Sequence, residues 1–238
     1  MKSIKKQITC IFLCAIFSLF ITPQLGAQQD VPQEVIKAAQ EGLPSFLESL
    51  SQKIVTKNTS SMLPVPDSAI PSIPSLKVTH GFNEDDPLDE AYLGEPFKLY
   101  LLTNDAILNY TKDSNVTSVL SQTDEWYFPV MIGEEAKSIL KVAKLQGSWQ
   151  AGSFGMGEAA VELGKIRKQW PIDKGYTPLL VECYAASGYL FTVPQYDSKN
   201  LTVITPPWMI MKGEEADKDY SKLEDLDSVI EELKSKIE

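Results

Sequence analysis

The sequence predicts an α+β fold: an antiparallel sheet of about five to seven strands, a crossover helix, and amphipathic helices at both ends of the mature chain. Most strand-like segments follow one another directly, two short turns have the composition of hairpin loops, and helical stripes begin and end the chain. Strands and helices do not alternate, so a doubly wound parallel sheet is not expected. The 238 residues, 43% of them hydrophobic and 23% charged, are enough for a substantial core.

Residues 1–27 have the composition of a secretory signal peptide, which we expect to be cleaved after Ala27. Three lysines precede an apolar run of 15 residues, Ile8 to Thr22, and small residues follow it. A bilayer span needs about 20 apolar residues. The segment therefore predicts export, to the exterior or the cell envelope, with no stable membrane span after cleavage.

Cleavage makes an acidic chain more acidic. The whole chain has a formal charge of −10, and removal of three lysines leaves 19 basic and 32 acidic residues, a charge of −13. Such a surface repels phosphate backbones, so nucleic-acid binding is not expected. Cys10 and Cys14 leave with the signal peptide, and Cys183 then has no cysteine to form an intramolecular disulfide with.

Four of the six asparagines lie in Asn-x-Ser/Thr triplets. In a eukaryotic secretory pathway these would be surface glycosylation sites, whereas in a bacterium the triplets carry no meaning. The lack of a disulfide favours a bacterial source. The four residues are Asn58, Asn109, Asn115 and Asn200.

Proline divides the mature chain. We predict an N-terminal helical segment at 28–60, a Pro-rich linker at 61–80, and an α+β domain with a C-terminal helix at 81–238. Gly42 and Pro44 are expected to kink or split the first helix. Its apolar stripe is Val35, Ala39, Leu43, Phe46, Leu50 and Ile54, and the linker contains Pro64, Pro66, Pro71 and Pro74.

Apolar and aromatic runs bounded by turn residues give the strands. Gly133-Glu134 and Ser187-Gly188 are expected to be hairpin turns. The predicted strands are Phe97–Leu102, Trp126–Ile132, Ser138–Leu145, Trp149–Phe154, Leu179–Ala185, Tyr189–Val193 and Leu201–Ile204.

A change to helical period predicts two further helices. One covers 158–170 and ends at Pro171. The other follows a capping box formed by Ser221 and Glu224. The apolar stripe of this terminal helix is Leu223, Leu226, Ile230, Leu233 and Ile237.

A glycine pair precedes the helix at 158–170. Gly155-Met-Gly157-Glu-Ala-Ala160 matches part of the dinucleotide-binding fingerprint, in which glycines let the backbone approach pyrophosphate at a helix N-terminus. The preceding strand belongs to a hairpin and Glu158 would face the phosphate. We therefore favour a tight strand-to-helix turn, and predict no cofactor.

Cys183 and His80 are the thiol and the imidazole of the mature chain, and a cysteine hydrolase needs both. Cys183 lies in the middle of a predicted strand, on the same side as the small apolar residues Val181 and Ala185. Catalytic cysteines usually lie at a helix N-terminus or an exposed turn, where their pKa falls. We therefore expect a packed cysteine, and keep the hydrolase as the alternative.

The acidic stretch at 83–90 carries oxygen ligands of the kind that calcium prefers. Its spacing is not that of an EF-hand loop, because Pro87 interrupts it and no glycine turn follows. A solvated loop is the favoured interpretation, and zinc would need a second histidine or cysteine. The calcium candidates are Asp85, Asp86, Asp89 and Glu90.

Aromatic residues could form a carbohydrate-binding platform, but most occupy positions where a core would use them. They are Trp126, Tyr127, Phe128, Trp149, Phe154 and Trp170. A separate apolar segment follows two prolines, and we expect either an edge strand or an exposed patch for a partner. Its partner-binding candidates are Trp208, Met209, Ile210 and Met211.

Few catalytic parts are present, so the sequence favours a secreted, non-catalytic binding or interaction module for a protein, peptide or cell-surface ligand. One alternative is a secreted hydrolase that uses Cys183 with His80. A carboxylate-only enzyme drawing on Asp124 or Glu125 is a second, since paired carboxylates can catalyse without histidine. A structural protein of the cell envelope is the third.

Overall fold

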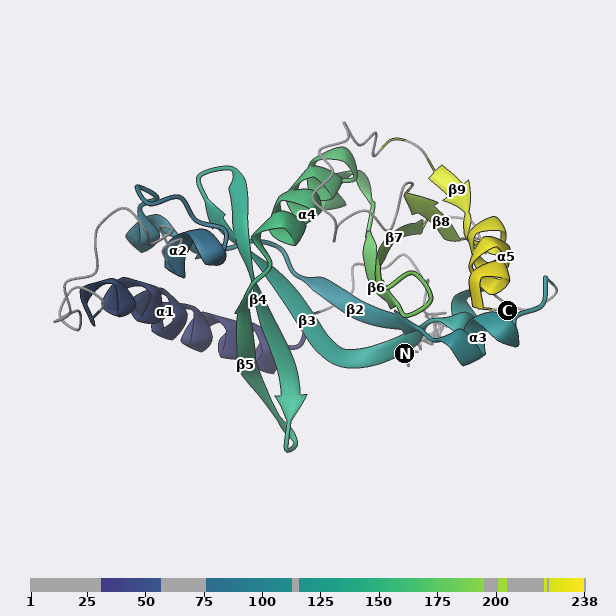
Figure 1. Cartoon of the computed structure of the whole chain (residues 1–238), viewed down its shortest axis with the longest axis horizontal. Helices are drawn as coiled ribbons and strands as arrows, with labels where there is room; N and C mark the ends of the chain where they lie inside the picture. The colour runs from purple at the N-terminus through teal and green to yellow at the C-terminus, as the bar shows by residue number, and fades with distance from the viewer. Residues whose placement is uncertain are drawn as a thin grey trace, which may run out of the picture.

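The computed structural model describes residues 31–56, 76–112, 116–194, 201–204, 221 and 223–237 (Figure 1). Several sequence predictions fall outside these residues. They are the signal peptide at 1–27, the four linker prolines, the partner-binding candidates at 208–211, and the glycosylation candidates Asn58, Asn115 and Asn200.

The described strands form one sheet, in the order β5-β4-β3-β2-β6-β7-β8-β9, and β1 pairs with β3 beside this path. Every pair is antiparallel except β2 with β6. The predicted α+β class with a mainly antiparallel sheet is confirmed. The strands are β1 Tyr92–Leu93, β2 Phe97–Leu102, β3 Ser121–Ile132, β4 Glu135–Leu145, β5 Ser148–Gly155, β6 Leu179–Cys183, β7 Gly188–Pro194, β8 Leu201–Ile204 and β9 Leu223–Asp225.

The helices lie at both ends of the chain and between the strands. Pro44 lies within the first helix, which continues through it as one element, so the predicted split does not occur. Burial of Val35, Ala39, Leu43 and Leu50, on both sides of Pro44, outweighs the local cost of the proline. The helices are α1 Gln33–Thr56, α2 Leu76–Thr79, α3 Asn104–Leu108, α4 Gly157–Gln169 and α5 Leu226–Ile237, and the 3-10 turns are Leu88–Glu90, Val116–Val119 and Ile172–Lys174.

The predicted capping box at the C-terminal helix is wrong. Leu223–Asp225 forms β9, which pairs with β8, and α5 begins at Leu226. The backbone groups around Glu224 form hydrogen bonds with β8, so they do not depend on the partners that a capped helix start would have given them. The pairing of Val203 with Glu224 lies at the centre of this contact.

Helix α4 makes the predicted crossover. The chain runs from β2 through the β3-β4-β5 meander, enters α4, and returns beside β2 as β6. Because β2 and β6 run the same way, their link must carry the chain back across the sheet, and α4 does so against one face. The parallel pairing extends from Leu99 with Leu180 to Leu102 with Cys183.

Side-chain alternation divides the core into three clusters on two faces of the sheet. Leu180 of β6 packs with α4, whereas its neighbour Val181 packs with α3 and α5. The third cluster joins α1 to β3 and β4, through Trp126 and Phe128 on the face away from α4. Figure 1 shows α1 and α5 over different halves of the sheet. Among the described helices, none is long and apolar enough to cross a membrane.

The contact between α1 and β5 is close at one glycine. A Cβ placed on Gly42 would lie 2.2 Å from the Cβ of Ala151. Only a residue without a side chain can occupy that helix position while α1 keeps its distance from the sheet. The predicted N-terminal helix therefore docks on the sheet through a size match between two small residues.

We expect Gly42→Ala to lower the free energy of unfolding by about 1–2 kcal/mol, because overpacking exceeds the gain in helix propensity. Urea unfolding measures this. Ala151→Gly should rescue the variant, and Gly152→Ala, whose Cβ would meet nothing within 4 Å, is the matched control. A stabilised Gly42→Ala protein would contradict the docking.

A tyrosine ties the α3 region to α5. The buried Tyr110 donates a short hydrogen bond to Oδ1 of Asp227, at the start of α5. Burial and this hydrogen bond raise the pKa of Tyr110 from 10.0 to about 12. The neutral phenol is thus the form that the fold stabilises.

Tyr110→Phe should cost about 1 kcal/mol of stability at neutral pH. A raised folded pKa gives a contribution that is complete below pH 10.0 and is lost as pH rises through about 12. The difference between parent and variant should therefore shrink across that interval in denaturant titrations. A difference independent of pH would rule out the tether.

Candidate functional site

Cys183 lies at the end of β6 and has no exposed surface (0%). Leu102, Leu190 and Ile230 belong to the same apolar cluster. Burial raises the pKa of the Cys183 thiol, opposed by hydrogen bonds to the backbone of Ala186 and Ala185. The thiolate form that a nucleophile needs is therefore disfavoured.

His80 lies in another part of the molecule, directly after α2. Its ring stacks on Phe154 of β5, with the ring centroids 5.9 Å apart, and its Nδ1 is 3.3 Å from Oγ1 of Thr79. Cys183 packs against α5 instead. Within the described residues, no contact joins the thiol to the imidazole, so the structure does not bring the hydrolase candidates together.

The acidic stretch is tied into the fold by a lysine. Oδ2 of Asp86 accepts a hydrogen bond from the backbone N–H of Asn83 at 2.7 Å, and Oδ1 lies 3.5 Å from Nζ of Lys137. Glu135 contacts the same lysine at 2.8 Å. The other calcium candidates, Asp85, Asp89 and Glu90, are exposed. Across the described ranges, no group of three or more metal-ligating side chains comes together.

The glycine pair before α4 serves backbone packing. A Cβ on Gly157 would lie 2.5 Å from Cα of Gly81, and one on Gly81 would lie 2.0 Å from the carbonyl oxygen of Lys137. Gly155 has a φ of 144° and Met156 a φ of 61°, a left-handed turn into the helix. The positive φ values confirm the predicted tight turn from strand to helix, and Gly157 in addition permits a close approach between the α2 turn and α4.

The structure also shows the positions of the carboxylates considered for catalysis, of one glycosylation candidate and of the aromatic residues considered for carbohydrate binding. Glu125 forms an ion pair with Nζ of Lys141 at 2.6 Å, and Asp124 is exposed. The described glycosylation candidate, Asn109, is exposed at the end of α3 and donates a hydrogen bond from Nδ2 to the carbonyl of Asp105.

The aromatic residues Trp126, Tyr127 and Phe128 are buried in the core, and Trp149, Phe154 and Trp170 are partly buried against it.

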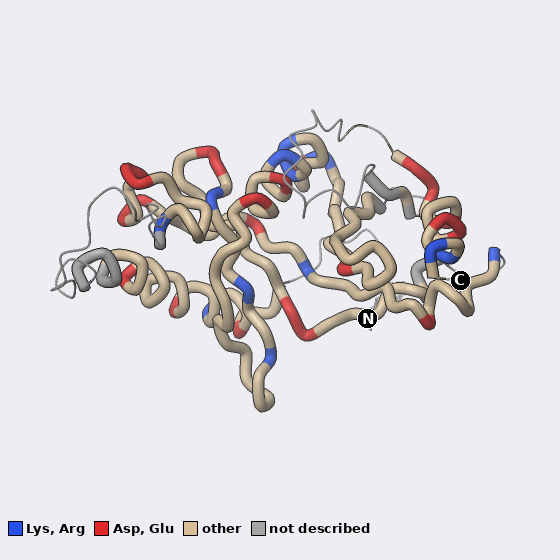
Figure 2. Tube along the Cα trace, in the orientation of Figure 1, with Lys and Arg blue, Asp and Glu red and all other residues tan. Residues whose placement is uncertain are grey.

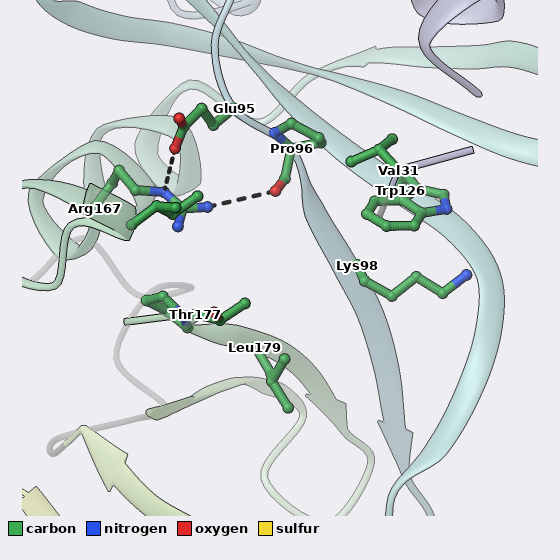
Figure 3. A pocket seen from close by; sticks show the side chains of 10 residues that line it. Val31, Glu95, Pro96, Lys98, Trp126, Arg167, Thr177 and Leu179 are labelled. Atoms are coloured by element: carbon green, nitrogen blue, oxygen red, sulfur yellow. Dashed lines mark hydrogen bonds and ion pairs between the residues drawn. The ribbon is translucent and has the colours of Figure 1, made fainter. Parts of the chain in front are cut away.

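Sequence reasoning missed a cavity where β2 and β6 begin. It has a volume of about 100 Å³ and lies before the first paired residues of the two parallel strands. Two basic side chains, from Lys98 and Arg167, line it together with Glu95 and Thr177 (Figure 3). Figure 2 shows the basic residues of α4, the helix that carries Arg167, in a chain where red acidic segments predominate.

Arg167 forms one wall of the cavity. Its guanidinium packs 4.2 Å over the ring of Phe97. Nε is 3.7 Å from Oε2 of Glu95, and Nη2 donates to the carbonyl oxygen of Pro96 at 3.4 Å. Burial lowers the pKa of Arg167, and Glu95 opposes this effect. A guanidinium nevertheless remains charged in a protein, so a buried positive charge is fixed at this wall.

Lys98 projects from β2 on the other side of the strand (Figure 3). It is 8% exposed, and its ammonium lies 5.0 Å from the ring centroid of Trp126 and 5.7 Å from that of Trp149. Burial lowers the pKa of Lys98, while Asp124 and Glu125 raise it. Two indole faces therefore replace part of the stabilisation that water would give the ammonium.

The cavity gathers hydrogen-bond donors that lack acceptors. Within the described part of the chain, five buried side-chain polar atoms have no hydrogen-bond partner, and three of them belong to residues that line this cavity. The three are Nε1 of Trp126 and Nε and Nη1 of Arg167. All three are N–H groups, but Nε1 of Trp126 lies on the far side of β2 from Arg167 (Figure 3). The wall formed by Arg167 is suited to a ligand that accepts hydrogen bonds and carries negative charge.

Two signals in the sequence could have revealed this site. Lys98 is the charged residue within the apolar run Phe97–Leu102, and Arg167 follows Leu163 by four residues, on the apolar stripe of its helix. A charge at a position that the pattern assigns to the core is costly unless something pairs with it. Both signals are visible without a structure.

Thiol labelling tests the placement of Cys183. We expect the native protein to label slowly at this residue and the unfolded protein rapidly, because burial raises the thiol pKa. Cys183→Ala, which should cost about 1 kcal/mol through a small cavity, identifies the signal of this residue by difference from Cys10 and Cys14. Rapid labelling of folded protein at Cys183 would contradict the buried position.

Comparison with known proteins assigns no role to the cavity. No family model, curated protein or solved structure matches the chain. The assignment of a function therefore depends on the cavity and its side chains.

Proposed function

We propose that the chain is an exported, non-catalytic binding module that holds an anionic group of its ligand in the cavity at the start of β2 and β6. One observation carries the proposal: of the five buried side-chain polar atoms without hydrogen-bond partners in the described residues, three belong to two residues lining this cavity. Buried polar groups are normally hydrogen-bonded. A bound anion would supply an acceptor to the guanidinium of Arg167.

The local charge supports an anion despite the acidity of the chain. Arg167 brings a positive charge to one wall of the cavity, and Glu95 is the carboxylate among the lining residues. Lys98 also lines the cavity, with its ammonium on the other side of β2, against Trp126 and Trp149 (Figure 3). Charges in partly buried surroundings interact more strongly than exposed ones, because water screens them less. The net charge of −10 should slow the approach of an anion more than it weakens the bound state.

The absence of a nucleophile at the cavity supports binding without catalysis. Its described lining contains no cysteine, serine or histidine, and Thr177 is the one hydroxyl. Cys183 is buried in the cluster under α5, and His80 stacks on β5. Export of the module is proposed from the signal-like segment at 1–27.

Thermal or chemical unfolding in different sodium salts tests the proposal. At constant ionic strength, we expect at least one of acetate, phosphate and sulfate to stabilise the protein relative to chloride, by about 1.4 kcal/mol at ten times its Kd. Arg167→Met, which keeps an unbranched apolar stem over Phe97, should abolish the effect. Lys168→Met, which removes an exposed charge next to it on α4, is the control and should retain it. Equal stabilisation of both variants would contradict binding at the cavity.

A further inference from the structure

We propose that the anionic group is a carboxylate on a short aliphatic chain, with Arg167 binding the carboxylate and the apolar wall binding the chain. This inference rests on the proposed function and names the chemistry of its ligand. Such a group is available from a free short-chain monocarboxylic acid or from the C-terminus of a peptide. Both present the same planar monoanion.

Arg167 has an unused edge that matches a carboxylate. Of its five N–H groups, one donates a hydrogen bond to a described residue, from Nη2 to Pro96 at 3.4 Å. The edge formed by Nε and Nη2 faces Glu95 and Pro96, whereas Nη1 lies on the side toward Thr177 (Figure 3). Nη1 is buried without a partner. Nη1 and the second hydrogen of Nη2 have the geometry to donate two parallel hydrogen bonds to one carboxylate. Because Nη1 has less than 1 Å² of accessible surface, this binding requires a small shift of the side chains that cover it.

The remaining walls favour a carbon chain over further anionic oxygens. Pro96, Ile172 and Leu179 present apolar surface to the cavity, and Val31 adds to it from the residues before α1. Phosphate or sulfate would place oxygens against these apolar side chains, which donate no hydrogen bonds. Its second charge would also lie near Glu95, which is 3.7 Å from the same guanidinium.

The volume of the cavity limits the length of the ligand's aliphatic chain. A water molecule needs about 10–15 Å³ of such space, and this cavity has about 100 Å³. It therefore holds about 7–10 water-sized groups. We expect acetate, propionate, butyrate and hexanoate to enter, and decanoate to gain nothing from its extra methylene groups.

The test is a titration followed at the indole N–H of Trp126, whose Nε1 is buried beside the cavity. The four tryptophan signals are assigned with Trp126→Phe. In NMR spectra at neutral pH and constant ionic strength, propionate should bind about fourfold tighter than acetate, for one more buried methylene. Phosphate and sulfate should leave the signal unchanged.

Two variants locate the carboxylate. Arg167→Lys keeps the charge but loses the two-pronged edge, and should weaken propionate binding about tenfold. Glu95 is 60% exposed in its side chain, so Glu95→Gln should fold, and should tighten binding about two- to fivefold by removing a nearby like charge. Glu84→Gln, an exposed carboxylate on another loop, is the matched control and should change nothing.

The outcomes separate the inference from the proposed function. Binding of phosphate or sulfate as tightly as propionate would overturn the carboxylate assignment and leave an anion-binding module. No binding by any of these anions would overturn both. If Arg167→Lys fails to fold, an unchanged affinity in Glu95→Gln overturns the inference by itself. N-acetylalanine binding tighter than propionate would identify a peptide end as the source, and the reverse order a free acid.

Discussion

The parallel pairing of β2 with β6 holds the molecule together. On one side of it lies the meander β3-β4-β5, covered by α1, and on the other lie β6 to β9, covered by α5. The pairing begins at Leu99 and Leu180. The residues before this point diverge, and the space between them is the cavity. The same contact thus joins the two halves of the sheet and creates the candidate site.

Burial of two cations beside that contact costs stability. A charge removed from water needs compensation, and here the compensation is incomplete: rings of Trp126 and Trp149 face Lys98, and Arg167 has one long hydrogen bond and one loose ion pair. Replacement of such groups by apolar residues often stabilises a protein. Their presence at one cavity is the pattern that binding sites show when function opposes stability.

Local patterns predicted the elements well, and pairing across the sequence poorly. The bounds of β2 and β8 match the predicted runs, and α4 differs by one residue at each end, because apolar period and turn residues determine these elements. The parallel β2–β6 contact depends on residues about 80 positions apart, for which a single sequence gives no signal. At Leu223–Asp225 the sequence has a local capping motif, but these residues pair with β8 as a strand.

The site was missed for a related reason. Lys98 and Arg167 are charges within apolar patterns, and each alone resembles an imperfect core position. Only the fold brings the two residues to one cavity, because β2 comes before the meander and α4 comes after it. By contrast, Cys183 and His80 have residue types that suggest catalysis, but they lie in different clusters of the fold.

Val31 has a consequence for how the protein can be handled. This residue lines the cavity, and it lies four positions after Ala27, the expected cleavage point. The new amino terminus made by the signal peptidase would therefore be separated from a cavity wall by only three residues. An affinity tag fused there would add bulk and charge near the cavity, whereas α5 carries the other end of the described chain on a separate cluster. Carboxy-terminal fusions would keep the tag away from Val31.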